Sequence, residues 1–287
     1  MDRMLSRRQC GAWLLAAAWM AGWAVGAQAQ ALPHKDSLQV LTQKMELLTV
    51  NPAQPDKVLR RTAVVGLPEG ETLLGMDYRV AKGMLYVLSS AGRLYTLDVP
   101  TGVLTVVGSG TGVALQGDAF GVDFNPVADR VRVVSSAGQN LRLHPDTGAV
   151  AATDPAPAYA PTDPRAGSQP ELVAAGYTYN KTDEKLTTNY AIDRNGAYLV
   201  TQGSPEGVQP VVSFNTGLLF SVGPLGIEDI VDANLDIADV TGAAFATVAT
   251  KGQPGARLYS VDLKTGKATL LGPVGEGAKV IGIAIEP

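Results

Sequence analysis

Three aspartates recur at matching positions of short apolar segments, and they are the residues of this chain best suited to chemistry. They are Asp77, Asp123 and Asp236. Asn125 lies two residues from Asp123, and Asn234 lies two residues from Asp236, so each asparagine is on the same strand face as its aspartate. Carboxylate and amide oxygens suit a hard cation such as Ca²⁺, and paired carboxylates also serve general acid–base catalysis. The alternative is that each side chain pins its own blade through hydrogen bonds from backbone N–H groups. On sequence alone we favour that structural interpretation.

A second candidate site is the densest charged cluster of the chain, which contains Asp129, Arg130, Arg132 and Arg142. Arg130 and Arg132 project from one strand face, and guanidinium groups can clamp an anion or a carboxylate bidentately. The alternative is Arg–Asp bracing between neighbouring strands, which we favour because an arginine in a buried sheet needs a partner. The candidate ligand-binding residues are thus the three aspartates, Asn125, Arg130 and Arg132. The candidate metal ligands are the three aspartates alone.

The usual catalytic motifs are missing from the sequence. The only histidines are His34, near the N-terminus, and His144, which precedes a proline in a predicted turn, so no multi-histidine metal site can form. The sequence contains no Gly-x-Ser-x-Gly, and its Gly108–Gly112 stretch lacks the lysine of a phosphate-binding loop. We therefore favour a protein that is not an enzyme.

The elements that position these residues repeat at a fixed interval. Gly75–Tyr78 returns as Gly121–Phe124, and Ser89–Gly92 returns unchanged as Ser135–Gly138, both 46 residues later. Two independent landmarks with one spacing indicate a duplicated unit, and short alternating segments within it are typical of a β-propeller blade.

Within one unit the period-two pattern predicts four strands, with the innermost carrying the aspartate. The four are Gly75–Arg79, Met84–Ser89, Arg93–Asp98 and Val103–Gly108, and the same order is predicted at Gly121–Asp154, Ala174–Phe214 and Ala233–Gly272. A glycine closes the outer hairpin at Gly102, Gly148 and Gly266, and Gly207 is predicted to do so in the third of these four units.

The two ends of the chain supply a fifth unit. Val280–Ile285 looks like an inner strand with nothing after it, while Leu38–Gln43, Met45–Val50 and Val58–Gly66 look like three strands that lack one. Pairing the C-terminal strand with the N-terminal strands closes the ring and removes the open sheet edges. We predict an all-β propeller of five blades, or six if the proline-rich segment Asp154–Pro170 contains strands.

The first 29 residues have the parts of a cleaved signal peptide: basic residues, the apolar run Ala12–Val25 and a small-residue cleavage site. Cleavage after Ala29 or after Ala31 fits equally well. We expect a periplasmic or secreted protein with a flexible tail at 30–37 and a single propeller domain at 38–287. Ser6-Arg7-Arg8 resembles a twin-arginine signal, with ordinary secretion as the alternative.

The cysteine content, the net charge and the apolar runs of the sequence limit the kinds of partner that we expect. The single cysteine, Cys10, lies in the leader, so the chain forms no internal disulfide. Loss of three arginines and one aspartate with the leader changes the formal charge from −4 to −6, which argues against nucleic acid or an anionic membrane. No segment reaches the roughly 20 apolar residues of a membrane span. We expect a monomer that binds an unknown protein or small molecule.

The second unit also resembles a known family. Gly121–Pro126, Asp129–Ser135 and Gly138–Gly148 are similar to the bacterial exported family called domain of unknown function 4394, as are Arg93–Asp98 and Arg257–Asp262. The resemblance spans nearly all of 38–287 and implies a β-propeller in the bacterial envelope or outside the cell. It implies no activity. The third unit departs from the pattern, because Tyr177–Asn180 replaces the aspartate-bearing segment.

Two classes of function follow. The first is a binding or scaffold propeller whose loops carry the specificity. The second is a metal-assisted hydrolase or lactonase-like enzyme that uses the acidic residues of the channel, and only analogy of fold supports it. We rank binding first and expect no cofactor, with Ca²⁺ as the cation that the aspartates suggest.

Overall fold

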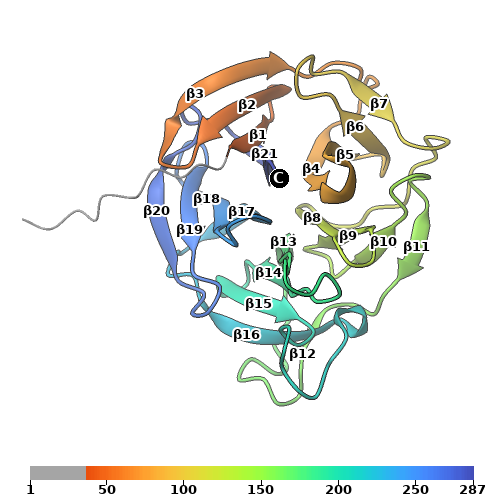
Figure 1. The fold of residues 1–287 in the computed structure, drawn as a ribbon. Helices are drawn as coiled ribbons and strands as arrows, with labels where there is room; N and C mark the ends of the chain where they lie inside the picture. The colour runs from red at the N-terminus through yellow and green to blue at the C-terminus, as the bar shows by residue number, and fades with distance from the viewer. Residues whose placement is uncertain (1–36) are drawn as a thin grey trace, which may run out of the picture. The chain divides into compact units, whose positions relative to one another are not determined.

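The computed structural model describes residues 37–287, which form five sheets arranged as a ring (Figure 1). The predicted signal peptide at 1–29 and all but the last residue of the predicted tail lie outside the described residues. The five sheets follow one another in chain order, so the prediction of a five-bladed β-propeller is confirmed.

Each blade contains four strands ordered from the central channel outward. Blade 1 has β21 (Val280–Ile285), β1 (Leu38–Thr42), β2 (Glu46–Asn51) and β3 (Gln54–Ala63); blade 2 has β4 (Leu73–Arg79), β5 (Met84–Ser89), β6 (Leu94–Leu97) and β7 (Leu104–Val106); blade 3 has β8 (Phe120–Asn125), β9 (Arg130–Ser135), β10 (Asn140–Leu143) and β11 (Val150–Thr153). Blade 4 has β13 (Leu172–Tyr177), β14 (Asn189–Asp193), β15 (Tyr198–Gln202) and β16 (Leu218–Pro224), with β12 (Ala158–Tyr159) outside them; blade 5 has β17 (Ile230–Ile237), β18 (Ala244–Thr250), β19 (Arg257–Val261) and β20 (Ala268–Pro273).

The described helices are the 3₁₀ turns η1 (Val80–Lys82) and η2 (Phe214–Thr216). No helix in residues 37–287 is long and apolar enough to cross a membrane.

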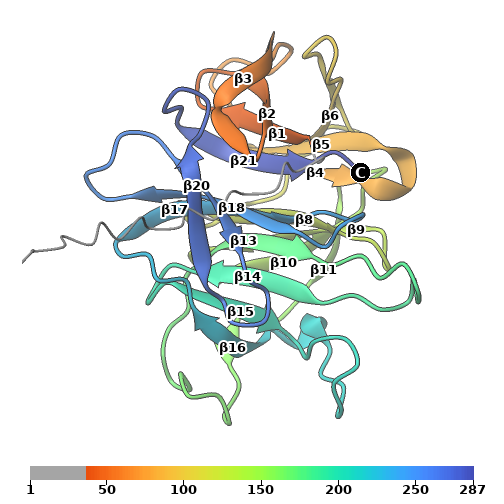
Figure 2. The same ribbon diagram turned by 60° about the vertical axis from the view of Figure 1, so that its left-hand side comes forward.

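The ring closes within blade 1. The C-terminal strand β21 pairs antiparallel with β1, with Leu38 opposite Ile285 and Val40 opposite Ile283. The side chains of these four residues are buried in one apolar cluster, which explains why both strands are strongly hydrophobic. Figure 1 shows the C-terminus beside the central axis, and Figure 2 shows β21 lying alongside β4 of the next blade. The predicted closure is confirmed.

Blade 4 differs from the sequence prediction. The predicted unit ends at Phe214 and uses Gly207 as its hairpin glycine, whereas the outer strand β16 begins at Leu218. Gly217 directly precedes it and has a φ of 74°, the left-handed conformation that favours glycine. The assignment of Gly207 is wrong because residues 203–217 form an insertion that offers an earlier glycine.

The proline-rich segment adds to blade 4 instead of forming a sixth blade. Its two-residue strand β12 pairs parallel with β16, with Ala158 opposite Leu218. Prolines on either side keep the strand short, since a proline cannot donate to a sheet ladder.

The inner strands approach one another closely around the channel. A Cβ atom on Gly121 would lie 2.5 Å from the carbonyl carbon of Ala174 in the next blade. A Cβ on Gly75 would meet the Val122 side chain at 2.8 Å. Glycine near the start of β4 and β8 therefore lets these strands approach their neighbours closely at the axis.

Candidate cation site in the central channel

Three of the predicted residues meet in the channel. Asp77 on β4, Asp123 on β8 and Asp236 on β17 each bring one carboxylate oxygen within 4.8 Å of the others. The three residues are 7%, 3% and 6% exposed. The ring thus gathers, from three separate blades, carboxylates that lie far apart in the sequence.

A common register explains why the aspartates converge. In each of these three blades, the carboxylate accepts a hydrogen bond from a backbone N–H of the next blade's inner strand. The pairs are Asp77 with Phe124 (2.7 Å), Asp123 with Tyr177 (3.0 Å) and Asp236 with Ile285 (2.5 Å). Every donor immediately follows the aspartate position in its own strand, so Gly176 of β13 and Ala284 of β21 occupy that position in the remaining two blades. The inner strands of blades 4 and 1 therefore have glycine and alanine where those of blades 2, 3 and 5 have aspartate.

These carboxylates also make local bonds, as the structural interpretation expects. Asp77 accepts the N–H of Tyr78 (2.7 Å), and Asp236 accepts that of Ile237 (2.6 Å). Asp123 accepts through Oδ1 alone, and within the described residues no hydrogen bond reaches its Oδ2. The aspartates therefore link blade to blade and still present unused oxygen lone pairs to one another.

The electrostatics of the cluster are unfavourable without a partner. Burial raises the pKa of Asp77 and Asp123 well above the usual value, and the neighbouring carboxylates raise both further. Burial also raises the pKa of Asp236 to about 7. Among residues 37–287, no lysine or arginine forms an ion pair with any of the three. Three clustered carboxylates without a counter-charge require protons or a cation.

The space beside the cluster matches a single small ion. A cavity of about 10 Å³ lies at this end of the channel, lined by the three aspartates and by Asp239, whose pKa burial raises to about 6. That volume is about one water-sized sphere. With Ca²⁺–oxygen distances of about 2.3–2.6 Å, two oxygens on opposite sides of one ion lie roughly 4.6–5.2 Å apart, and three spread evenly around it lie roughly 4.0–4.5 Å apart. Separations of up to 4.8 Å are therefore compatible with one shared ion.

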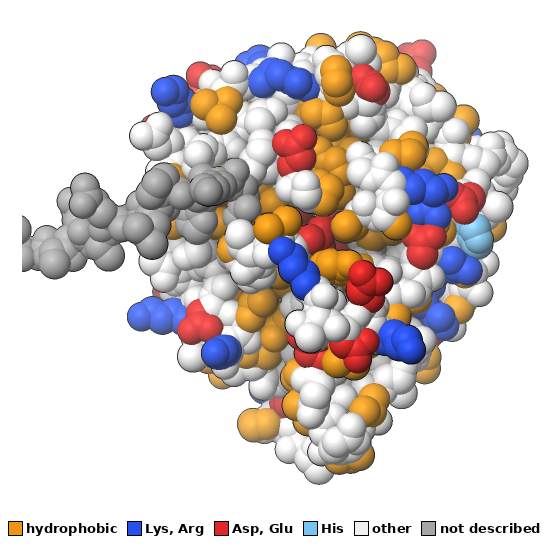
Figure 3. All heavy atoms as spheres, in the orientation of Figure 1, with side chains coloured by type: hydrophobic (Ala, Val, Ile, Leu, Met, Phe, Trp, Pro, Cys, Tyr) orange, Lys and Arg blue, Asp and Glu red, His pale blue; other side chains and the backbone are white. Residues whose placement is uncertain are grey.

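Figure 3 views the ring from the side on which the inner strands end. Acidic, basic and apolar side chains are interspersed over this face, with no broad patch of a single sign. The concentration of negative charge is thus internal, at the three aspartates, and does not continue as an acidic surface.

The remaining predicted residues lie elsewhere. Asn125 accepts the N–H groups of Val127 and Ala128 (both 2.9 Å) and so shapes the turn after β8. Arg130 donates to the carbonyl oxygens of Asp129 and Ala128 in that turn. Neither residue is joined to the aspartate cluster.

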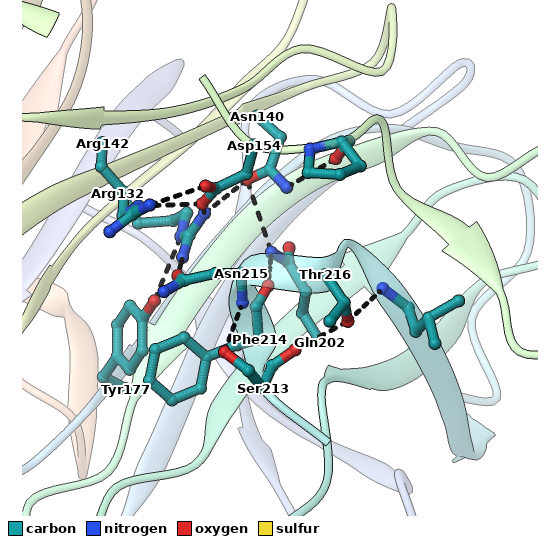
Figure 4. Close-up of polar contacts among 12 residues, drawn as sticks. Arg132, Asn140, Arg142, Asp154, Tyr177, Gln202, Ser213, Phe214, Asn215 and Thr216 are labelled. Atoms are coloured by element: carbon teal, nitrogen blue, oxygen red, sulfur yellow. Dashed lines mark hydrogen bonds and ion pairs between the residues drawn. The ribbon is translucent and has the colours of Figure 1, made fainter. Parts of the chain in front are cut away.

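Arg132 forms the centre of a buried network between blades 3 and 4 (Figure 4). It is 1% exposed and donates to Asp154 (2.6 Å), Asn140 (2.6 Å), Asn215 (2.8 Å) and the Tyr177 hydroxyl (3.1 Å). Every donor nitrogen therefore has a partner within the protein. The arrangement braces two blades, as a fully buried guanidinium requires.

The arginines of the charged cluster identified in the sequence form no ion pair with its aspartate, Asp129. Arg142 donates two bonds to Asp154 (2.9 and 2.8 Å), which therefore pairs with two arginines at once. Asp129 instead pairs with Arg79 of blade 2 (2.8 Å). Sequence reasoning missed Asp154 because it lies in the proline-rich segment beyond the strand.

A sequence profile described as domain of unknown function 4394 matches residues 46–284, which include strands of all five blades. The chain belongs to this family. No curated protein matches it. For this DUF4394 propeller, the geometry of the channel is thus the guide to function.

Proposed function

We propose that this DUF4394 propeller is a binding module whose channel holds one divalent cation, with Ca²⁺ as the candidate. Asp77, Asp123 and Asp236 would be its ligands. The observation that carries the proposal is the convergence of three buried carboxylates without a counter-cation among the described residues. An oxygen-binding cation neutralises the cluster and bridges three of the five inner strands.

The bound cation would act on stability. Each aspartate is already attached to the next inner strand by a backbone hydrogen bond, so a cation shared by all three would connect blades 2, 3 and 5 at the axis. A rigid ring of this kind supports binding by the loops on its faces, as rigid scaffolds commonly do. We place this function outside the cytoplasm, as the leader sequence predicts.

The size of the cavity favours binding over the alternative of a metal-assisted hydrolase or lactonase. A space of about 10 Å³ accepts one ion or one water and is too small for an organic substrate. A cation at these residues is thus suited to holding the ring together.

The test is thermal unfolding of the purified protein, followed by far-UV circular dichroism after treatment with EDTA and again with Ca²⁺, Mg²⁺ or Zn²⁺ added. A ligand selective for the folded state increases the free energy of unfolding, by about 2.7 kcal/mol at a ligand concentration of a hundred times Kd, and so raises the midpoint temperature. We expect a saturable rise with Ca²⁺, and Asp123→Asn should abolish it.

Asp123→Asn is a sharp variant because asparagine keeps an oxygen that can accept the Tyr177 N–H. It removes the charge while the link to blade 4 can persist. Asp56→Asn makes the same change of charge at an exposed position of β3 and should leave the Ca²⁺ response unchanged. A midpoint insensitive to all three cations, or a response that survives in Asp123→Asn, would contradict the proposal.

A further inference from the structure

A second hollow opens at the opposite end of the channel, where the inner strands begin. Its volume is about 430 Å³, within the range typical of small-molecule sites. The first residues of β4, β8 and β21 and the turn between β1 and β2 contribute to its wall. Between it and the aspartate cluster, mostly apolar residues that include Met76, Val122 and Ile283 line the channel, with Asn234 among them, and leave a space of about 10 Å³. The hollow is therefore separate from the candidate cation site.

One part of this hollow is apolar. Met45, Leu74 and Ile281 line it and are partly exposed, and Phe120 lies beside them at 8% exposure. Partly exposed apolar side chains within a concave surface provide area that a hydrocarbon group can cover.

The charged groups of the hollow leave one carboxylate without a counter-charge. Glu71 forms an ion pair with Arg93, and Asp118 forms one with Arg194 at 3.0 Å. Asp232 accepts its own neighbour's N–H at 2.9 Å, and it forms no ion pair within residues 37–287. Arg194 also pairs with Glu171 at 2.6 Å, so four carboxylates share two arginines around this hollow and leave an excess of two negative charges. Asp232 is the carboxylate of the lining that forms no ion pair.

We propose that this mouth of the channel binds an organic monocation, a protonated amine with an apolar body. The ammonium group would face Asp232, and the hydrocarbon body would cover Phe120 and Leu74. A neutral apolar ligand would desolvate Asp232 without pairing it, and an anion would be repelled by it. The carboxylates of this lining do not converge as Asp77, Asp123 and Asp236 do, so a bare metal ion would find no shared set of oxygen ligands here.

The environment of Asp232 supports this assignment. Burial raises the pKa of its carboxyl to about 6, even though the charge of Arg194 acts in the opposite direction and Asp118 adds to the rise. The other charged groups around the hollow are Glu71, which pairs with Arg93, and Glu171, which shares Arg194 with Asp118. At pH 7.5 Asp232 is thus ionised, partly desolvated and unpaired, which is the state that an ammonium ligand would stabilise.

The experiment is isothermal titration calorimetry at pH 7.5 with 2-phenylethylamine as the probe and 2-phenylethanol as its neutral counterpart. We expect saturable binding of the amine, with the alcohol bound at least tenfold more weakly because it cannot form the charge-assisted bond. Asp232→Asn should weaken amine binding by about 10- to 100-fold. The matched control Asp56→Asn should bind the amine as wild type does.

Two further variants keep the test decisive. Thr72→Lys places a fixed ammonium on the lining and should also weaken amine binding, so the result does not depend on Asp232→Asn alone. Asp123→Asn should bind the amine normally, which separates this site from the cation site. The proposal is overturned if the alcohol binds as tightly as the amine, if Asp232→Asn and Thr72→Lys leave amine affinity unchanged, or if 2-phenylethylamine and hexylamine both fail to bind.

Discussion

Replacement of Asp232 by asparagine should stabilise the protein at neutral pH and leave its stability unchanged near pH 4 and below. Burial raises the pKa of this carboxyl from 3.8 to about 6, so the folded protein binds the proton more tightly than the unfolded chain does. As the pH rises from about 4 to 6, the wild type therefore loses stability that the asparagine variant keeps. A difference of about two pKa units corresponds to about 3 kcal/mol, which partial exposure at the channel mouth reduces to about 1–2 kcal/mol.

The assay is urea unfolding at pH 4, 5, 6, 7 and 8, followed by far-UV circular dichroism with EDTA present throughout. Subtracting the free energy of unfolding of the wild type from that of the variant cancels every other titrating group. Asp118 faces Asp232 and stays ionised over most of this range, because the Ser136 hydroxyl and Arg194 lower its pKa. The difference should be near zero at pH 4, rise up to about pH 6 and level off above pH 7.

The reasoning is refuted if the difference does not vary with pH, or if the wild type is more stable than the variant at pH 7. Asp56→Asn provides the baseline, since its carboxylate is exposed on β3. The asparagine introduced by Asp232→Asn would still offer an oxygen to the Ala233 N–H, so loss of that hydrogen bond is not expected to offset the gain.

Two further predictions concern the ring itself. Gly121→Ala should lower the free energy of unfolding by about 1–3 kcal/mol, and by more than Gly75→Ala does. The new Cβ at position 121 would meet the backbone of Ala174 at 2.5 Å, whereas the one at position 75 would meet the movable side chain of Val122 at 2.8 Å. Urea unfolding of both variants measures the two losses, and equal losses would contradict the prediction. Arg132→Met should cost about 3–5 kcal/mol through its four lost hydrogen bonds, and Arg142→Met, at a residue that is partly exposed, should cost less than half as much. A larger loss for Arg142→Met would show that Arg132 is not the main brace.

The architecture could be predicted because blade repeats are local in sequence. The 46-residue interval predicts blades 2 and 3. The apolar pattern of β21 and β1 predicts the closure, since no strand follows β21 and no inner strand precedes β1. The prediction fails at blade 4, where residues 203–217 intervene between β15 and β16. A glycine in an insertion looks the same in sequence as one that closes a hairpin.

The candidate site was only half predictable. The sequence identifies Asp77, Asp123 and Asp236 as equivalent, but it cannot show that their oxygens meet, because this depends on how five blades close around one axis. Pairings such as Arg132 with Asn215 join residues 83 positions apart through a loop that no repeat predicts. The position of Asp232 at a channel mouth likewise depends on the ring.

The inner strands combine two requirements at two positions. Glycine near the strand start permits the close approach of neighbouring blades, and the aspartate two residues later in blades 2 and 3 attaches each strand to the next. Five such aspartates would gather five negative charges in one buried cavity, a cost that a single divalent cation could not offset. Gly176 and Ala284 at the remaining positions limit the inner strands to three such aspartates, a number that one cation can balance more closely even with Asp239 beside them. Under the proposed function, the residues that break the repeat in blades 1 and 4 thus keep the charge of the channel closer to what one divalent ion can offset.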